Sequence, residues 1–156
     1  MSTDQHTKTA VTGTSREMTR DEISALFARR QEAYEDLDAA ALAADYSDDA
    51  TIESPVTGLH GKADAERNLK VVFDAFLDLK MTFDPPIIDG PQVALYATAA
   101  GTNMGGFMGL PPSGRPFKLA TAFFYEVKDG KIIREQRVYD FTGLLVRIGL
   151  LKAKPV

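Results

Sequence analysis

The segment from Gly130 to Gly149 constrains the fold more than any other part of the chain. It follows Asp129-Gly130, a dipeptide typical of tight hairpins because glycine tolerates positive φ and the aspartate can bond to its own turn. Residues 131–139 predict a strand, with polar and apolar side chains on both of its faces. An apolar set at near-helical spacing follows: Phe141, Leu144, Leu145, Ile148 and Leu150. Asp140 is therefore expected at the junction between a strand and a short apolar helix.

A carboxylate at this junction has two interpretations. Asp140 could cap the following helix by accepting a hydrogen bond from the backbone of Thr142 or Gly143. It could instead transfer protons within an apolar setting supplied by the flanking Phe, Leu and Ile side chains. Strand alternation places Gln136 on the same face as Asp140, whereas Arg137 has the opposite parity and is expected to be a surface or ion-pair residue.

The rest of the chain predicts helices first and strands afterwards. Residues 1–18 are polar and are expected to form a tail, and a single domain is expected over residues 19–156. Thr19 and Glu22 have the spacing of a capping box that opens a helix, and further helices are expected over residues 39–46 and 63–78. Strands are expected over residues 51–54, 81–83, 93–103, 117–127 and 131–139. This order indicates an α+β fold in which helices cover one face of a curved antiparallel sheet.

Three segments carry a resemblance to a known family: residues 45–61, the glycine-rich stretch 101–115, and Tyr139-Asp140-Phe141-Thr142-Gly143 with its apolar continuation. Through them, residues 23–152 resemble the SnoaL-like polyketide cyclases of the nuclear-transport-factor-2-like and steroid-isomerase-like superfamily. The resemblance implies a cone-shaped α+β barrel with a small-molecule pocket and dimerisation through the sheets. It also implies that Asp140 is the general acid/base of an aldol cyclisation that needs no metal or organic cofactor.

A candidate site follows from the strand faces and the resemblance together. We expect Asp140 to carry the proton, with Gln136 and Asn103 as hydrogen-bond partners for an enolate oxygen. The other candidate substrate-binding residues are Tyr34, His60, Phe76, Met104 and Phe107. For Tyr34 a core position with its hydroxyl at the rim is the simpler interpretation, and for His60 it is a solvated turn. Met104 and Phe107 could form a pocket lip or pack across a dimer interface.

Two other functions stay open at this point. An epoxide-hydrolase-like enzyme of this superfamily relies on a carboxylate pair and an arginine, but residues 93–104 contain neither Asp nor Glu. A binding or accessory module would use the cone to hold an apolar ligand and the sheet to associate. For the cyclase or isomerase with Asp140 as acid/base, the expected chemistry is aldol cyclisation or isomerisation of a hydrophobic carbonyl or polyketide-like compound.

Composition narrows the choice of partners and cofactors. The 156 residues contain no cysteine and two histidines, so a thiolate or imidazole metal site is not expected. A net charge of -4 without a basic stripe disfavours nucleic acid. No apolar run reaches the ~20 residues of a membrane-spanning helix, so neither a membrane partner nor a membrane location is expected. These features predict a cytoplasmic protein. The pocket that the resemblance implies is expected to bind a small hydrophobic molecule.

Overall fold

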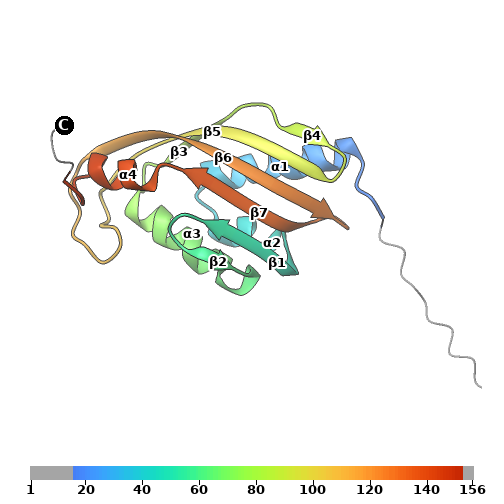
Figure 1. Cartoon of the computed structure of the whole chain (residues 1–156), viewed down its shortest axis with the longest axis horizontal. Helices are drawn as coiled ribbons and strands as arrows, with labels where there is room; N and C mark the ends of the chain where they lie inside the picture. Colours follow the sequence, from blue (N-terminus) through green and yellow to red (C-terminus); the bar gives the residue numbers. More distant parts are fainter. Residues whose placement is uncertain (1–15, 153–156) are drawn as a thin grey trace, which may run out of the picture.

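The computed structural model describes residues 16–152. Residues 1–15 of the expected tail lie outside that range. The described residues form four helices, and Figure 1 shows the first three on one side of a curved sheet and the last at the end of the final strand. The expected α+β class, with helices before the sheet, is confirmed. No helix within residues 16–152 is both long enough and apolar enough to span a membrane.

Local sequence signals set the starts of three helices. Helix α1 (Arg20–Glu35) opens with the capping box of Thr19 and Glu22. Helix α2 (Ala39–Ala44) is capped by Asp38, whose side chain accepts from the backbone of Ala41. Helix α3 (Lys62–Ala75) is longer than α2 and has no side-chain cap. It buries one stripe of residues, Ala65, Leu69, Phe73 and Ala75. Helix α4 (Phe141–Arg147) is capped by Asp140.

The seven strands form one mixed sheet. They are β1 (Tyr46–Ser54), β2 (Gly58–His60), β3 (Lys80–Phe83), β4 (Ile87–Asp89), β5 (Gln92–Thr102), β6 (Pro116–Lys128) and β7 (Lys131–Tyr139). The order is β2-β1-β7-β6-β5-β3, with β4 also paired to β5. Strand β1 pairs with β7 in parallel. The expectation of an antiparallel sheet is therefore wrong for this pair of strands. The sheet also stays open, because its edge strands β2 and β3 do not pair with each other.

A β-bulge in β7 determines which of its side chains point inward. Val127 of β6 pairs with Ile132, but the preceding Glu126 pairs with Arg134, so Ile133 has no partner on β6. The extra residue reverses the alternation of the strand. Ile132 is buried, and beyond the bulge Glu135 is buried while Val138 is exposed. Gln136 and Asp140 therefore do not share the inward face of Ile132.

Candidate functional site

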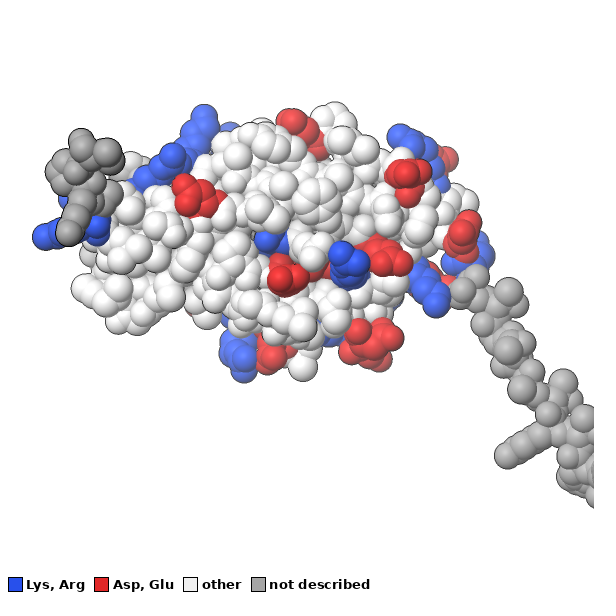
Figure 2. All heavy atoms as spheres, viewed as in Figure 1, with Lys and Arg blue, Asp and Glu red and all other residues white. Residues whose placement is uncertain are grey.

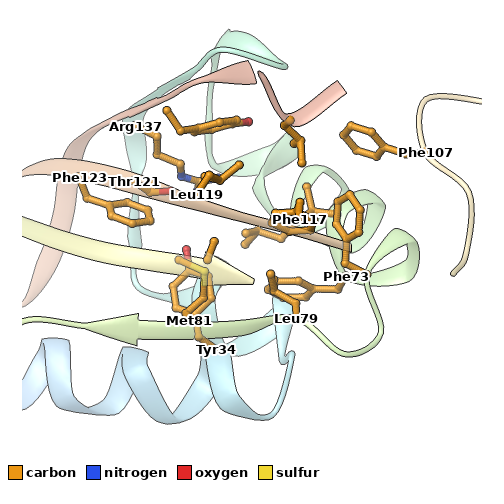
Figure 3. Close-up of a pocket in the computed structure, with 16 residues that line it drawn as sticks. Tyr34, Phe73, Leu79, Met81, Phe107, Phe117, Leu119, Thr121, Phe123 and Arg137 are labelled. Carbon is orange, nitrogen blue, oxygen red and sulfur yellow. The ribbon is translucent and has the colours of Figure 1, made fainter. Parts of the chain in front are cut away.

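The helices and the concave face of the sheet enclose an apolar cavity. Its empty volume, counted with its open mouth, is about 640 Å³. Aromatic and aliphatic side chains from α1, α3, α4 and four strands line it (Figure 3): Tyr34, Leu69, Val72, Phe73, Phe76, Leu79, Met81, Ala99, Phe107, Phe117, Leu119, Thr121, Phe123, Arg137, Tyr139 and Leu144. Small-molecule sites are mostly apolar in this way, with a few polar groups that fix the ligand.

One charged side chain lies among the lining residues. Arg137 extends from β7 toward the middle of the cavity, and Tyr34 extends its hydroxyl from α1 on the opposite side (Figure 3). The Thr121 hydroxyl and the Tyr139 phenol complete the polar part of the lining. The polar groups come from α1 and from the strands β6 and β7. These two strands are neighbours in the sheet, where Thr121 pairs with Tyr139 and Phe123 pairs with Arg137.

Arg137 is held in place by Glu135, two residues earlier on the same face. The Arg137 Nε donates to Glu135 Oε2 at 2.8 Å, and its Nη2 lies 2.7 Å from the same oxygen. Burial alone would raise the pKa of Glu135, but the charges of Arg137 and Arg30 more than offset it and the pKa lies below its ordinary value. Glu135 is therefore ionised at neutral pH although it has no exposed surface.

Behind this pair lies a longer row of alternating charges. Arg30 of α1 places Nη2 at 3.9 Å from Glu135 Oε1 and donates from Nη1 to Asp45 at 3.2 Å. Asp45 also accepts from Arg29 at 2.8 Å, and Arg29 lies at the surface. The Tyr46 hydroxyl is within 3.5 Å of both Arg30 and Arg137. The row runs from the surface at Arg29 to the cavity at Arg137.

The tyrosines near this row are protonated at neutral pH. Burial raises the pKa of Tyr34, an effect that nearby Arg137 only partly offsets. Burial likewise raises the pKa of Tyr139 to about 12. Both phenols therefore keep their protons and can donate hydrogen bonds into the cavity.

Five of the eight sequence-derived candidates lie outside the lining, and three of these are on or next to the strands β2 and β7. Asp140 is exposed, and its side chain accepts from the backbone N–H of Gly143 at 2.8 Å, which is the helix-capping interpretation. Gln136 lies on the opposite face of β7, where it donates to Glu53 at 3.1 Å. His60 lies in β2 beside Thr57, and burial together with the charge of Arg137 lowers its pKa.

The other five candidates divide between the cavity and the long loop. Tyr34, Phe76 and Phe107 line the cavity. Asn103 is fully buried but is not a lining residue, since its side chain donates to Ser113 at 3.2 Å and its backbone pairs with Gly114 and Arg115. Met104 is half exposed, and its backbone N–H bonds to Ala75 at the end of α3.

Sequence reasoning missed the Glu135–Arg137 pair because it continued the alternation of β7 through Ile133. A signal for it was present. Glu135 and Arg137 are a carboxylate and a guanidinium at i and i+2, which can be buried together on one face of a strand. The other face presents Arg134, Gln136 and Asp140. On that face no acidic residue lies two positions from a basic one, so its charges cannot be paired between neighbours. Arg137 was expected to be a surface or ion-pair residue. In the structure it forms an ion pair, and its side chain lines the cavity and is not at the surface.

The fold and cavity define a class of protein: an α+β domain with a curved sheet and an apolar small-molecule cavity. Within that class the chain belongs to the SnoaL-like polyketide cyclase family, whose model matches residues 25–148. Among curated proteins, none matches the chain in sequence. In residues 16–152 no group of three His, Cys, Asp or Glu side chains is placed to hold a metal ion.

Solved structures with the same fold include two from Streptomyces above 25% identity. AclR of Streptomyces galilaeus, a proposed hydroxylase, is 26% identical with a TM-score of 0.76, and the match covers 88% of this chain and 87% of AclR. IdmH of Streptomyces antibioticus, a proposed polyketide cyclase, is 27% identical with a TM-score of 0.68, covering 81% and 97%. A Catenulispora acidiphila protein with a ketosteroid isomerase-like fold is 17% identical with a TM-score of 0.68, covers 83% and 97%, and shows the fold alone.

Proposed function

We propose that this protein is a small-molecule enzyme that performs acid/base chemistry on a hydrophobic carbonyl compound, by aldol cyclisation or isomerisation. The observation that supports the proposal is Arg137, a guanidinium fixed by a buried carboxylate inside an otherwise apolar cavity. In such a setting a fixed positive charge stabilises a negative charge that develops during the reaction. The chemistry proposed here uses the chain's own residues.

The proposed step is removal of a proton from the carbon next to a carbonyl group. The base takes the proton, the C–H electron pair forms the carbon–carbon double bond, and the carbonyl π electrons move to oxygen. Arg137 stabilises the resulting enolate oxygen with hydrogen bonds from nearby hydroxyls. In cyclisation the enolate carbon attacks a second carbonyl, whose oxygen takes up the proton from the base. In isomerisation the base returns the proton to a different carbon of the conjugated enolate.

Two carboxylates are candidates for the base. The family resemblance favours Asp140, which would have to exchange its bond to Gly143 for the substrate. Glu135 lies against Arg137, but its side chain is closed off from solvent. Asp140→Asn keeps a residue that caps helices well, so its effect on turnover can be separated from an effect on folding.

Exchange of the α-protons of 2-tetralone in D₂O, followed by proton NMR, tests the proposal without knowledge of the natural substrate. We expect the protein to accelerate exchange over buffer and Arg137→Met to remove most of the acceleration. Loss of exchange in Asp140→Asn would assign the base to Asp140, and retained exchange would remove it from that role. If the wild-type protein binds 2-tetralone without accelerating exchange, the enzymatic proposal fails.

That last outcome would favour a second function, in which the cavity holds an apolar ligand without turning it over. The specific observation in its favour is that no carboxylate lies among the cavity-lining residues. The binding function requires Arg137 and the aromatic walls but not Asp140. Asp140→Asn would then leave ligand affinity unchanged.

We also propose a second copy of this chain as partner, packed on the outer face of the sheet. Exposed or half-buried apolar residues lie in two neighbouring rows across that face: Tyr96, Ala122 and Val138 in one, and Ile87, Ala94 and Phe124 in the other. Figure 2 shows charged side chains scattered over the face in view, with uncharged atoms covering most of it. An apolar area of this kind is typical of a protein interface.

A further inference from the structure

We propose that the ligand of this cavity binds as an anion, with a carboxylate or an ionised enol at Arg137 and at the hydroxyls of Tyr34 and Thr121. The inference names the chemical class of ligand for the cavity described above and rests on that cavity, but it does not require turnover. The inference is based on the polar residues that line the cavity and on the row of charges that ends at Arg137.

Arg137 has a donor left over for a ligand. Its Nε and Nη2 are engaged by Glu135 and Tyr46, whereas Nη1 has no hydrogen-bond partner among residues 16–152. Tyr34 and Thr121 line the same cavity, and their hydroxyls can donate to the same ligand. A guanidinium presents its donors in a rigid plane, so Nη1 keeps a fixed direction while the other nitrogens stay bound.

The groups that face the cavity can all donate, and none of the lining side chains is a carboxylate or an amide. Both phenols stay protonated at neutral pH because burial raises the pKa of Tyr34 and of Tyr139. Glu135 does not change this balance, since its oxygens are buried behind Arg137. A cavity that offers donors selects ligands with acceptor oxygens.

The row of alternating charges adds a reason for a full negative charge. It contains three guanidiniums, Arg29, Arg30 and Arg137, and two carboxylates, Asp45 and Glu135. Each carboxylate is shared by two guanidiniums, so the row as a whole is one negative charge short. Its two ends are unequal, because water solvates Arg29 at the surface whereas apolar walls surround Arg137. A bound anion would supply the missing charge at the cavity end.

Charge-assisted hydrogen bonds are roughly twice as strong as neutral ones, and they strengthen further where water is excluded. A carboxylate should therefore gain more from this site than a neutral carbonyl of the same shape. A matched pair of probes is 2-naphthoate and 2-acetylnaphthalene, which differ in a carboxylate oxygen against a methyl group. The chain contains no tryptophan, so naphthalene fluorescence reports binding without interference from indole.

The experiment is a fluorescence titration of the full-length protein with both probes at pH 7. We expect 2-naphthoate to bind at least about tenfold more tightly than 2-acetylnaphthalene, the effect of ~1.4 kcal/mol. Arg137→Met should abolish this preference. Arg134→Met is the matched control, because it removes a guanidinium from the opposite, exposed face of the same strand and should leave the preference intact.

Two further variants guard against misfolding of Arg137→Met, which leaves Glu135 without its main partner. The double variant Glu135→Gln/Arg137→Met removes both charges and should bind the two probes equally. Glu135→Gln alone removes a competing negative charge and should strengthen 2-naphthoate binding relative to the ketone, a change that a merely structural role would not produce. Tyr34→Phe and Thr121→Val should each weaken 2-naphthoate binding several-fold.

The outcomes separate this inference from the proposed function. If 2-acetylnaphthalene binds as tightly as 2-naphthoate, the anion proposal is overturned, and the carbonyl-enzyme proposal stands. A preference for 2-naphthoate that persists in the double variant also overturns it. A preference that depends on Arg137 supports the inference even if 2-tetralone exchange is not accelerated, and if neither probe binds, both proposals fail.

Discussion

Glu135 has no exposed surface, yet it accepts two close contacts from Arg137 and lies near Arg30. Replacing it with Gln should lower the free energy of unfolding by about 3 kcal/mol, because two buried guanidiniums would lose the carboxylate between them. Urea unfolding followed by circular dichroism measures this change. Glu53→Gln is the control: Glu53 also bonds to a β7 side chain but on the exposed face of the sheet, so its loss should cost less than about 0.5 kcal/mol.

The same residue makes a prediction about pH. The pKa of Glu135 in the folded chain lies below its ordinary value of 4.5, because Arg137 and Arg30 favour the ionised form over the effect of burial. The stabilisation is therefore complete above pH 4.5 and is lost as the pH falls through the lower pKa of the folded state. Thermal unfolding between pH 3 and 7 should show a steeper acid loss in the wild type than in Glu135→Gln. Parallel curves would contradict the assignment.

Asp140 is expected to contribute to stability as a cap. Asp140→Ala should lower the free energy of unfolding by about 1 kcal/mol, since the backbone N–H of Gly143 loses its acceptor. Asp140→Asn should cost only a few tenths, because Asn caps helices about as well. Chemical denaturation of the two variants side by side measures the difference. Equal losses would show that capping is not what Asp140 contributes.

At the scale of elements, β7 shows what a sequence can and cannot predict. Its limits and the helix after it follow from Asp129-Gly130, the alternating residues and the apolar repeat, and the structure has both. The bulge at Ile133 leaves no comparable signal, because Ile133 could continue the alternation as well as interrupt it. A shift of one residue exchanges the two faces of a strand. Continuing the alternation through Ile133 places Gln136 on the inward face and Arg137 on the outward face, the reverse of the structure, although the limits of the strand are predicted correctly.

The loop between β5 and β6 places one side chain in the cavity. Gly105 lies so close to the backbone of Asp74 that a Cβ would overlap it, and its N–H bonds to Ala75. This attachment to α3 holds Phe107, whose ring lies 5.3 Å from that of Phe76. Phe107 therefore closes part of the cavity wall rather than packing against a partner chain.

Phe107→Ala should enlarge the cavity at the cost of stability. The loss of a buried ring predicts about 3 kcal/mol of destabilisation, and the space it leaves should favour 1-pyrenecarboxylate over the smaller 2-naphthoate. Fluorescence titration of both probes gives the ratio of affinities. Met108→Ala is the control, since Met108 is the exposed neighbour of Phe107. An unchanged ratio in Phe107→Ala would show that the loop does not limit ligand size.

At the scale of the whole molecule, the α+β class and the order of elements could be predicted because each helix has its own cap or apolar stripe. The parallel pairing of β1 with β7 could not, since residues 55–130 separate the two strands in the sequence. The polar end of the cavity is non-local in the same way. It combines Tyr34 of α1 with Thr121 of β6 and Arg137 of β7, and no local pattern relates these three residues.

The outer face of the sheet supports the last prediction, which concerns assembly. Val138 and Phe124 are 59% and 50% exposed at the ends of the two apolar rows, on the neighbouring strands β7 and β6, and both would be buried in a dimer formed through this face. Phe124→Lys should convert a dimer into a monomer, because a lysine buried in an apolar interface would lose its hydration without gaining a partner. Sedimentation velocity measures the mass. Leu77→Lys is the control, as Leu77 is equally exposed but lies between α3 and β3, away from the two rows. A wild-type protein that sediments as a monomer at micromolar concentration would refute the dimer, and a Phe124→Lys variant that remains dimeric would place the interface elsewhere.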